Sequence, residues 1–325
     1  MTRPDSCAPW KRNTFPLIFG AIRFLSLAVL TALTMGHGSA PAATIPVPNG
    51  SFESPLTPYV TINIDYWQKG KKPDWYQETG GFLWTQLTGA FKNTPEGSFD
   101  HLDNCDGDQA LWLFVVPEVS LFQDYDSVDW NDSAPTHAFD ATYEVGKSYA
   151  LTVAINGSGG GMSNGATMQI SLYYRDAASN MVTVAATVVT NTPESFSNHT
   201  HFIDYQALTP IVKATNAWAG QHIGILLLST VTTNLQGGYW DLDHVRLSSF
   251  EPSKLMAEAF TDGQFTFTLQ GEPESSFEIL ASADVTAPLS NWSSLGTVSN
   301  ITGTVTFTDM TANPSRRFYQ ARQWP

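Results

Sequence analysis

Alternating apolar and polar residues recur in short stretches between about residues 44 and 250. In the stretch SYALTVAI the apolar side chains fall on every second position: Tyr149, Leu151, Val153 and Ile155. Successive side chains of a strand point to opposite faces, so this spacing gives a β-strand one apolar face. Similar stretches are QALWLFVV, TMQISLYYRD, MVTVAATVVT, HIGILLLSTV and YWDLDHVRL. Sheets with one apolar face bury it against each other, so the pattern predicts a β-sandwich.

A polar segment with a proline, EPSKLMAE at residues 251–258, follows these stretches and predicts a linker. After it come shorter strand-like runs, QFTFTLQG, SSFEILASAD, GTVTFTD and RRFYQAR. The segment from 259 to 325 is long enough to form a small β-sandwich of its own. We therefore predict an all-β protein with one domain at residues 43–250 and a second at residues 259–325.

The first 42 residues have the features of a secretory signal peptide. Lys11, Arg12 and Arg23 precede the apolar run FLSLAVLTALTM, and the small-residue stretch GHGSAPAAT follows it. The apolar run is too short to span a bilayer comfortably, which favours a cleaved signal over a membrane anchor. We expect cleavage after Ala42, no membrane insertion afterwards, and a secreted, extracellular protein. Retention of this protein at the cell surface stays open. A membrane-retained N-terminus is the alternative.

Charge and cysteine content narrow the choice of partners. The chain has 16 Lys and Arg against 30 Asp and Glu, a formal net charge of −14 at pH 7. Nucleic acids and anionic membranes are bound through Lys and Arg, so this composition argues against both as partners. Outside the signal peptide the sequence has one cysteine, Cys105. An intramolecular disulfide is then excluded, and the core, or a bound metal ion, must stabilise an exported domain.

A succession of short motifs covers residues 45–249: PVPNGSFESP, DGDQALWLF, VSLFQDY, YEVGKSYALTVAINGSG, AGQHIGILLLS and WDLDHVRLSSF. This order resembles secreted bacterial jelly-roll modules of the galactose-binding-like kind, the architecture of many carbohydrate-binding modules. The C-terminal motifs FTFTL, SAD, NWSSLG, TFTD and RRFYQA resemble a different small module of bacterial surface and secreted proteins. Together the two resemblances imply a jelly-roll β-sandwich followed by a smaller β-sandwich domain.

The first resemblance also implies a structural calcium ion near the terminal strands. The NGSFE motif points to Asn49 and Glu53, and the DLDHVRL motif points to Asp243, with Asp241 as a weaker candidate. Calcium binds six to eight oxygen atoms, which carboxylates and turn carbonyls can supply. The alternative is that these acidic residues face solvent. The acidic stretch DNCDGDQ at residues 103–109 lacks the downstream glutamate of an EF-hand, and we expect it to form a turn.

Tryptophans in polar, glycine-rich loops indicate a carbohydrate site. The candidates are Trp67, Trp75, Trp84 and Trp130. An aromatic ring can stack on the C–H face of a sugar while neighbouring Asp, Asn and Gln bind its hydroxyls. We expect these four residues to form a platform for a neutral polysaccharide or glycan. The alternative is that each packs in the core, since aromatic residues dominate burial in β-sandwiches.

The motifs of common hydrolases are absent from the sequence. Neither a G-x-S-x-G elbow nor an H-E-x-x-H helix occurs, and the H-x-H of SNHTH is weak evidence for a metal. We therefore expect a protein that is not an enzyme and that binds extracellular carbohydrate without catalysis. Two alternatives stay open. One is a structural or adhesive surface protein with a protein partner. The other is a polysaccharide-degrading enzyme, whose carboxylate pair leaves no sequence signature.

Overall fold

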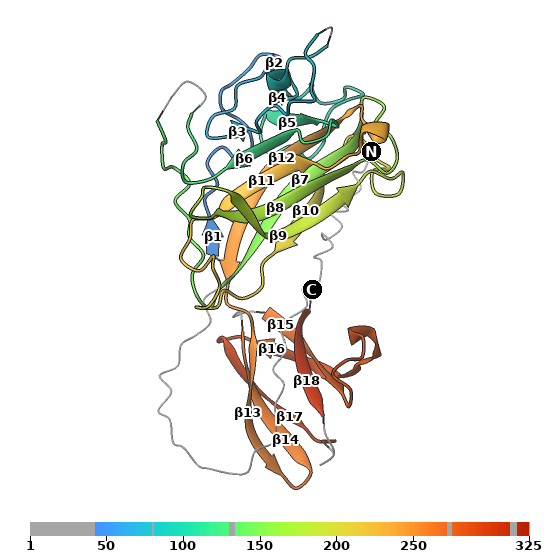
Figure 1. Cartoon of the computed structure of the whole chain (residues 1–325). Coiled ribbons are helices and arrows are strands. Elements are labelled where there is room, and N and C mark those ends of the chain that lie inside the picture. Colours follow the sequence, from blue (N-terminus) through green and yellow to red (C-terminus); the bar gives the residue numbers. More distant parts are fainter. Residues whose placement is uncertain (1–42, 80, 130–133, 272–274, 313–316, 325) are drawn as a thin grey trace. The chain divides into compact units, whose positions relative to one another are not determined.

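The computed structural model describes residues 43–79, 81–129, 134–271, 275–312 and 317–324. They form two compact units, Ala43–Ser249 and the described residues from Phe250 onward. Each consists of antiparallel sheets and short 3-10 turns (Figure 1). Within the described residues, no helix is long and apolar enough to cross a membrane. The expected signal peptide, residues 1–42, lies outside the described residues and stays a prediction.

The first unit is built from two sheets. In spatial order, the seven-stranded sheet contains β10 (Ile203–Leu208), β7 (Ser148–Gly159), β12 (Tyr239–Phe250), β5 (Gln109–Phe114), β4 (Thr88–Lys92) and β2 (Val60–Thr61), with β1 (Ala43–Ile45) also paired to β12. The five-stranded sheet contains β3 (Gln68–Lys69), β6 (Ser120–Gln123), β11 (Gly224–Ser229), β8 (Thr167–Arg175) and β9 (Met181–Thr190). Both sheets supply side chains to one core cluster, which makes the unit a sandwich.

Strand alternation divides the residues of the larger sheet between two faces. Leu111 and Leu113 of β5 and Trp240 and Leu242 of β12 are fully buried in the core cluster. Burying each such side chain contributes about 1.5–3 kcal/mol. The residues between them, Trp112 in β5 among them, therefore point away from the core. This outer face is where the functional site lies.

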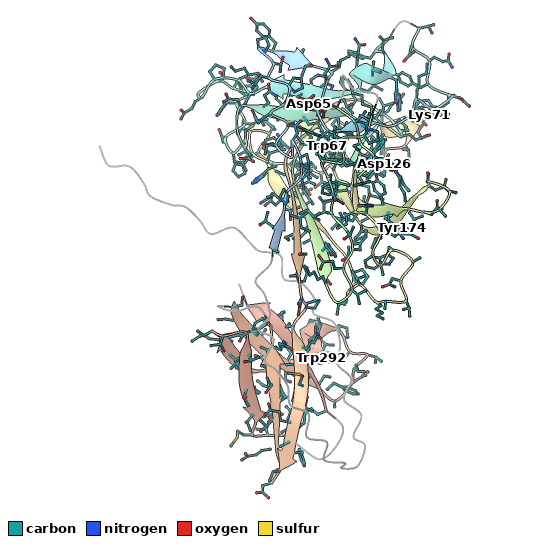
Figure 2. The ribbon with its side chains drawn as sticks, turned by 90° about the vertical axis from the view of Figure 1, so that its left-hand side faces the viewer. Asp65, Trp67, Lys71, Asp126, Tyr174 and Trp292 are labelled. Carbon is teal, nitrogen blue, oxygen red and sulfur yellow. The ribbon has the colours of Figure 1, made fainter. Side chains whose placement is uncertain are left out.

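The second unit has two three-stranded sheets. One contains β13 (Lys254–Thr261), β14 (Gln264–Gln270) and β17 (Thr304–Asp309), and the other contains β16 (Ser293–Asn300), β15 (Ser275–Ser282) and β18 (Phe318–Trp324). Phe267 and Ile279, from different sheets, are fully buried in its core, and Trp292 packs in a smaller cluster of the same unit (Figure 2). The predicted all-β fold, a jelly-roll sandwich followed by a smaller sandwich, is confirmed. Strand β13 begins at Lys254, inside the segment expected as a linker at 251–258.

Candidate functional site

A cavity of about 620 Å³ lies on the outer face of the seven-stranded sheet. Its floor comes from β4, β5, β7 and β12. Its rim comes from segment 93–108, which connects β4 to β5, and segment 191–202, which connects β9 to β10. These two segments hold each other, because Asp103 N donates to the Thr200 carbonyl at 2.8 Å and Thr200 Oγ1 donates to the Asp103 carboxylate at 2.9 Å. The loops thus surround part of the outer face and form a recessed site that stays open on one side.

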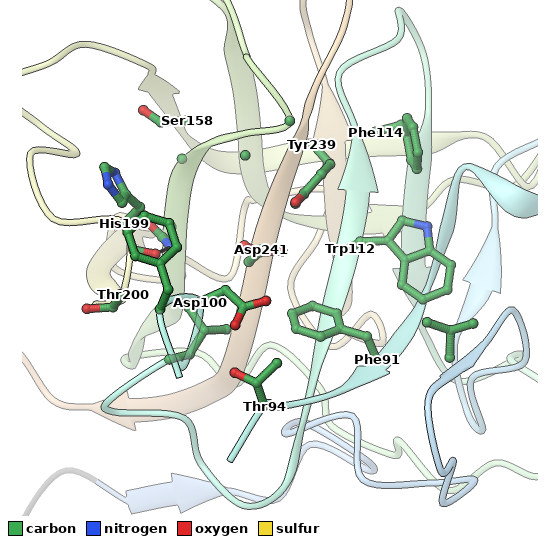
Figure 3. Close-up of a pocket in the computed structure, with 17 residues that line it drawn as sticks. Phe91, Thr94, Asp100, Trp112, Phe114, Ser158, His199, Thr200, Tyr239 and Asp241 are labelled. Atoms are coloured by element: carbon green, nitrogen blue, oxygen red, sulfur yellow. Dashed lines mark hydrogen bonds between the residues drawn. The ribbon is translucent and has the colours of Figure 1, made fainter. Parts of the chain in front are cut away.

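Sheet register aligns three residues across the floor of the cavity. Asp241 of β12 lies opposite Trp112 of β5, and Trp112 lies opposite Gly89 of β4 on its other side. A Cβ atom at position 89 would lie 2.3 Å from the Trp112 ring, so glycine is required where this ring crosses β4. The Trp112 Nε1–H donates to the Gln86 carbonyl at 3.1 Å, which fixes the ring in that position. Figure 3 shows Asp241 at the centre of this face, with Trp112 and Phe91 beside it.

Aromatic rings form a continuous wall along the cavity. The ring centroids of Phe114 and Tyr239, which both line the cavity, are 6.1 Å apart, and Phe82, outside the lining, packs 5.1 Å from Phe114. The Tyr239 ring packs closely over the backbone of Gly159 at the end of β7. The faces of such rings carry negative π density and attract cations, most strongly when water is excluded. The wall therefore suits an apolar ligand that develops positive charge.

Asp241 is the carboxylic acid on the floor of this cavity. Its residue surface is 9% exposed, and among the described residues its Oδ1 has no hydrogen-bond partner. Burial raises its pKa to about 8, because the charged form is poorly solvated there. Asp241 therefore carries a proton at neutral pH. Apart from His199, no basic side chain of the described residues lines the cavity, so a substrate's phosphate or carboxylate would find no counter-charge.

The predicted tryptophan platform is absent from this surface. Trp67 and Trp84 are almost fully buried, and their indole N–H groups donate to the carbonyls of Asn49 and Gly70 (Figure 2 for Trp67). Trp75 is 43% exposed, but it packs edge-on against Trp84 and donates to Glu118. Burial leaves Trp67 and Trp84 no free ring face for a sugar, so Trp75 is the exposed ring among the three described residues. Trp130 lies outside the described residues.

The four residues expected to bind calcium do not lie together. The Asn49 side chain bonds backbone groups of Ser54 and Asp65 and so fixes a local turn, while Asp241 faces the cavity. In the described part of the chain, no group of three or more His, Cys, Asp and Glu side chains is arranged to hold a metal ion. The four side chains therefore do not form one group, and the calcium ion itself stays a prediction.

Glu53 and Asp243 do meet, on the turn at residues 105–109. Glu53 Oε1 accepts from the N–H groups of Asp108 and Gln109 at 2.9 and 2.8 Å, and Asp243 Oδ2 accepts from the Asp106 N–H at 2.6 Å. Both carboxylates thus serve as acceptors for backbone donors, and burial raises the pKa of each. The segment DNCDGDQ is the expected acidic turn. Calcium binding at Glu53 and Asp243 stays a prediction.

The sequence pointed to Asp241 as a calcium ligand and gave no indication of the other residues that line the cavity. Missed residues are Phe91, Trp112, Phe114, Asn156 and Tyr239. One signal was available: QALWLF carries large aromatic residues at the positions that alternate with its core leucines. Aromatic residues on the outer face of a strand indicate that this face is also covered.

Comparison with known proteins gives a family match for the first unit. A family model described as HpiC1-like, HpiC1 cyclase, matches residues 43–248. No curated protein matches the chain.

Solved structures with a similar fold include a cyclase from Fischerella sp. TAU, at 23% identity and a TM-score of 0.46 over 65% of this chain and 98% of that one. A cyclase from the same source in complex with 4-(1H-indol-3-yl)butan-2-one gives 23% identity and a TM-score of 0.44 over 64% and 98%. The CBM22-1 xylan-binding domain of Paenibacillus barcinonensis Xyn10C gives 14% and 0.32 over 65% and 97%. At these identities, and with TM-scores below 0.5, the three structures establish nothing about the activity of this chain.

Proposed function

The chain belongs to the HpiC1-like family of cyclases, whose model matches residues 43–248, and we propose that its first unit is an enzyme that cyclises an apolar small molecule in the cavity. The family match corrects three expectations: that the protein is not an enzyme, that it binds carbohydrate, and that its partner is a neutral polysaccharide. Its similarity to carbohydrate-binding modules holds for the β-sandwich and does not extend to their function. The buried rings of Trp67 and Trp84 agree with this correction.

Asp241 is the proposed acid that starts the reaction. Its protonated carboxyl donates H⁺ to an imine nitrogen or a carbon–carbon double bond of the substrate, which leaves the Asp241 carboxylate and an iminium ion or carbocation. A second double bond or an aromatic ring of the same molecule attacks that cation and closes the new ring. The cyclised cation then loses H⁺ to Asp241, so the product is an isomer of the substrate. A positioned acid of this kind contributes about 10²- to 10⁴-fold to a rate.

The aromatic wall supports the cationic stage of this reaction. Trp112, Phe114 and Tyr239 line the cavity with aromatic rings and, apart from the Tyr239 hydroxyl, have no oxygen or sulfur nucleophile that would trap a carbocation. Burial raises the pKa of that hydroxyl, and the nearby charges of Asp241 and Asp100 raise it further, so it stays protonated and weakly nucleophilic. Exclusion of water by such walls protects a reactive cation from hydration.

The substrate class follows from the same walls. The cavity has a volume typical of small-molecule sites. Lys and Arg are absent from the described lining, so the cavity has no such side chain to bind a phosphate leaving group. This disfavours a reaction that starts by loss of phosphate and favours one that starts by protonation of a neutral substrate. We propose an alkenyl-substituted nitrogen heteroaromatic as the substrate class, because it combines an apolar body, a basic nitrogen and an internal nucleophile.

The observation that carries this proposal is the unpartnered, buried Asp241 carboxyl facing an aromatic cavity. The test is to incubate a panel of alkenyl indoles, indolenines and quinolines with the protein and to search for isomers of unchanged mass by chromatography and mass spectrometry. Asp241→Asn should abolish product formation. Asp100→Asn, at an exposed carboxylate of the same cavity, is the matched control and should retain it. Equal turnover by the wild type and Asp241→Asn would refute the assigned acid.

Export is part of the proposal and is tested separately. We propose that residues 1–42 direct the chain out of the cytoplasm and that the mature protein begins at Ala43. Mass spectrometry of the N-terminus of protein recovered from the medium or periplasm should give this residue. An intact N-terminus on the recovered protein would contradict the proposal.

A further inference from the structure

A second polar side chain, Asn156 of β7, faces the same cavity. Asn156 is 1% exposed, and its side-chain Oδ1 has no hydrogen-bond partner among the described residues. β7 is the neighbour of β12 in the sheet, so Asn156 and Asp241 lie on adjacent strands of the cavity floor. A buried acceptor without a partner costs free energy unless something bonds it.

The amide orientation of Asn156 is fixed by its other end. Its Nδ2 donates to the carbonyl of His199 at 2.6 Å, and His199 belongs to the rim segment that Asp103 and Thr200 hold in place. A flipped amide would set its oxygen against that carbonyl, which would leave two acceptors facing each other. The oxygen is therefore the atom left for the cavity, and it can only accept a hydrogen bond.

We propose that Asn156 is a specificity-determining residue that accepts a hydrogen bond from an N–H or O–H group of the substrate. This inference deepens the proposed function and rests on the cavity being the substrate site. It restricts the substrate to molecules that carry a donor next to the atom protonated by Asp241, with the apolar remainder along the aromatic wall. Asn156 selects molecules with this donor, because a ligand without it leaves the buried oxygen unsatisfied.

The other buried lining groups without a partner, Thr94 and Asp241, do not fulfil this role. Thr94 Oγ1 is also buried without a partner, but a hydroxyl can donate or accept and rotates to suit its neighbour. Asp241 is protonated at neutral pH and supplies the proton in the proposed reaction. Asn156 is thus the cavity's acceptor of fixed orientation.

The test compares two ligands that differ by one atom group. Indole and benzofuran have nearly the same shape, but only indole has an N–H donor. Binding of each to the mature protein at pH 6.5 is measured by isothermal titration calorimetry or ligand-observed NMR. We expect the wild type to bind indole about tenfold or more tightly than benzofuran. Equal affinities, or no binding of either ligand at millimolar concentration, would overturn the inference.

Two variants test whether Asn156 causes the preference for indole over benzofuran. Asn156→Leu should bring the two affinities within about twofold of each other, and the matched variant Asp241→Leu should keep the preference for indole. The reverse pattern would make Asp241 the residue that accepts from the indole N–H and would overturn the inference. If Asn156→Leu does not fold, indole and benzofuran binding to the wild type and to Asp241→Leu still tests the inference. Loss of the preference for indole in Asp241→Leu would overturn the assignment to Asn156. Retained preference without turnover of any panel compound would count against the proposed function alone.

Discussion

Replacing Asp241 with Asn should change how the stability of the protein depends on pH. In the native state burial raises the pKa of Asp241 from its ordinary value of 3.8 to about 8. Between these values the native protein holds a proton that the unfolded chain releases. Because the native pKa is the raised one, the stabilising contribution is fully present below about pH 4 and is lost as pH rises to about 8. Above pH 8 the loss is complete.

The size of the effect follows from that gap. Each pH unit of the gap corresponds to about 1.4 kcal/mol, so the free energy of unfolding should fall by on the order of 5 kcal/mol in total. That is a large part of the 5–15 kcal/mol that typically stabilises a domain. The asparagine amide has nearly the shape of the protonated acid and does not titrate. The difference in stability between the wild type and Asp241→Asn should therefore decline across this window and level off above pH 8.

The assay is urea denaturation of the mature protein, followed by tryptophan fluorescence, at intervals from pH 4 to pH 9.5. Asp243, whose pKa burial raises to about 7, is present in both proteins, so its contribution cancels in the difference. Asp100→Asn is the control and should follow the wild type, because Asp100 is exposed. Asp241 would not be protonated in the native state at neutral pH if this difference in the free energy of unfolding did not vary with pH, or if it stopped declining by about pH 5.

Three further predictions concern other parts of the first unit. Gly89→Ala should displace the indole ring above it, lower stability by about 1–3 kcal/mol in thermal unfolding and weaken ligand binding, whereas Gly81→Ala, with open space around it, should do neither. Burial, and next the charge of Asp243, raise the pKa of the Cys105 thiol, so iodoacetamide at pH 8 should label it far more slowly in native than in urea-unfolded protein; equal rates would contradict this. If calcium binds at Glu53 and Asp243, chelation should lower the melting temperature of the wild type and leave that of Glu53→Gln unchanged, and an unaffected wild type would remove the site.

The sandwich could be predicted from the sequence because its cause is local. Leu151, Val153 and Ile155 alternate with polar or small residues, and this period forces one apolar face whatever the sheet order. The cavity could not be predicted in the same way. Its rim depends on contacts such as Asp103 with Thr200, which are almost one hundred residues apart and leave no periodic signal.

Individual side chains show the same limit. Trp67 and Trp84 lie in loop-like sequence, yet the loops fold back and insert these rings into the interior. Asp241 and Asp243 share one face of β12, but Asp241 opens into the cavity while Asp243 bonds a turn. Alternation along a strand gives the face of a residue, and only the tertiary fold gives what covers that face.

The most direct test of the central claim is the pH dependence of kcat/KM for the first compound that the protein isomerises. The account predicts a constant value at neutral pH and a tenfold decline per pH unit above about pH 8, as Asp241 loses its proton. Asp241→Asn should lower kcat/KM by about 10²- to 10⁴-fold across the range. An activity that rises above pH 8, or that Asp241→Asn retains at the level of the wild type, would contradict the claim that Asp241 is the acid of a cyclase.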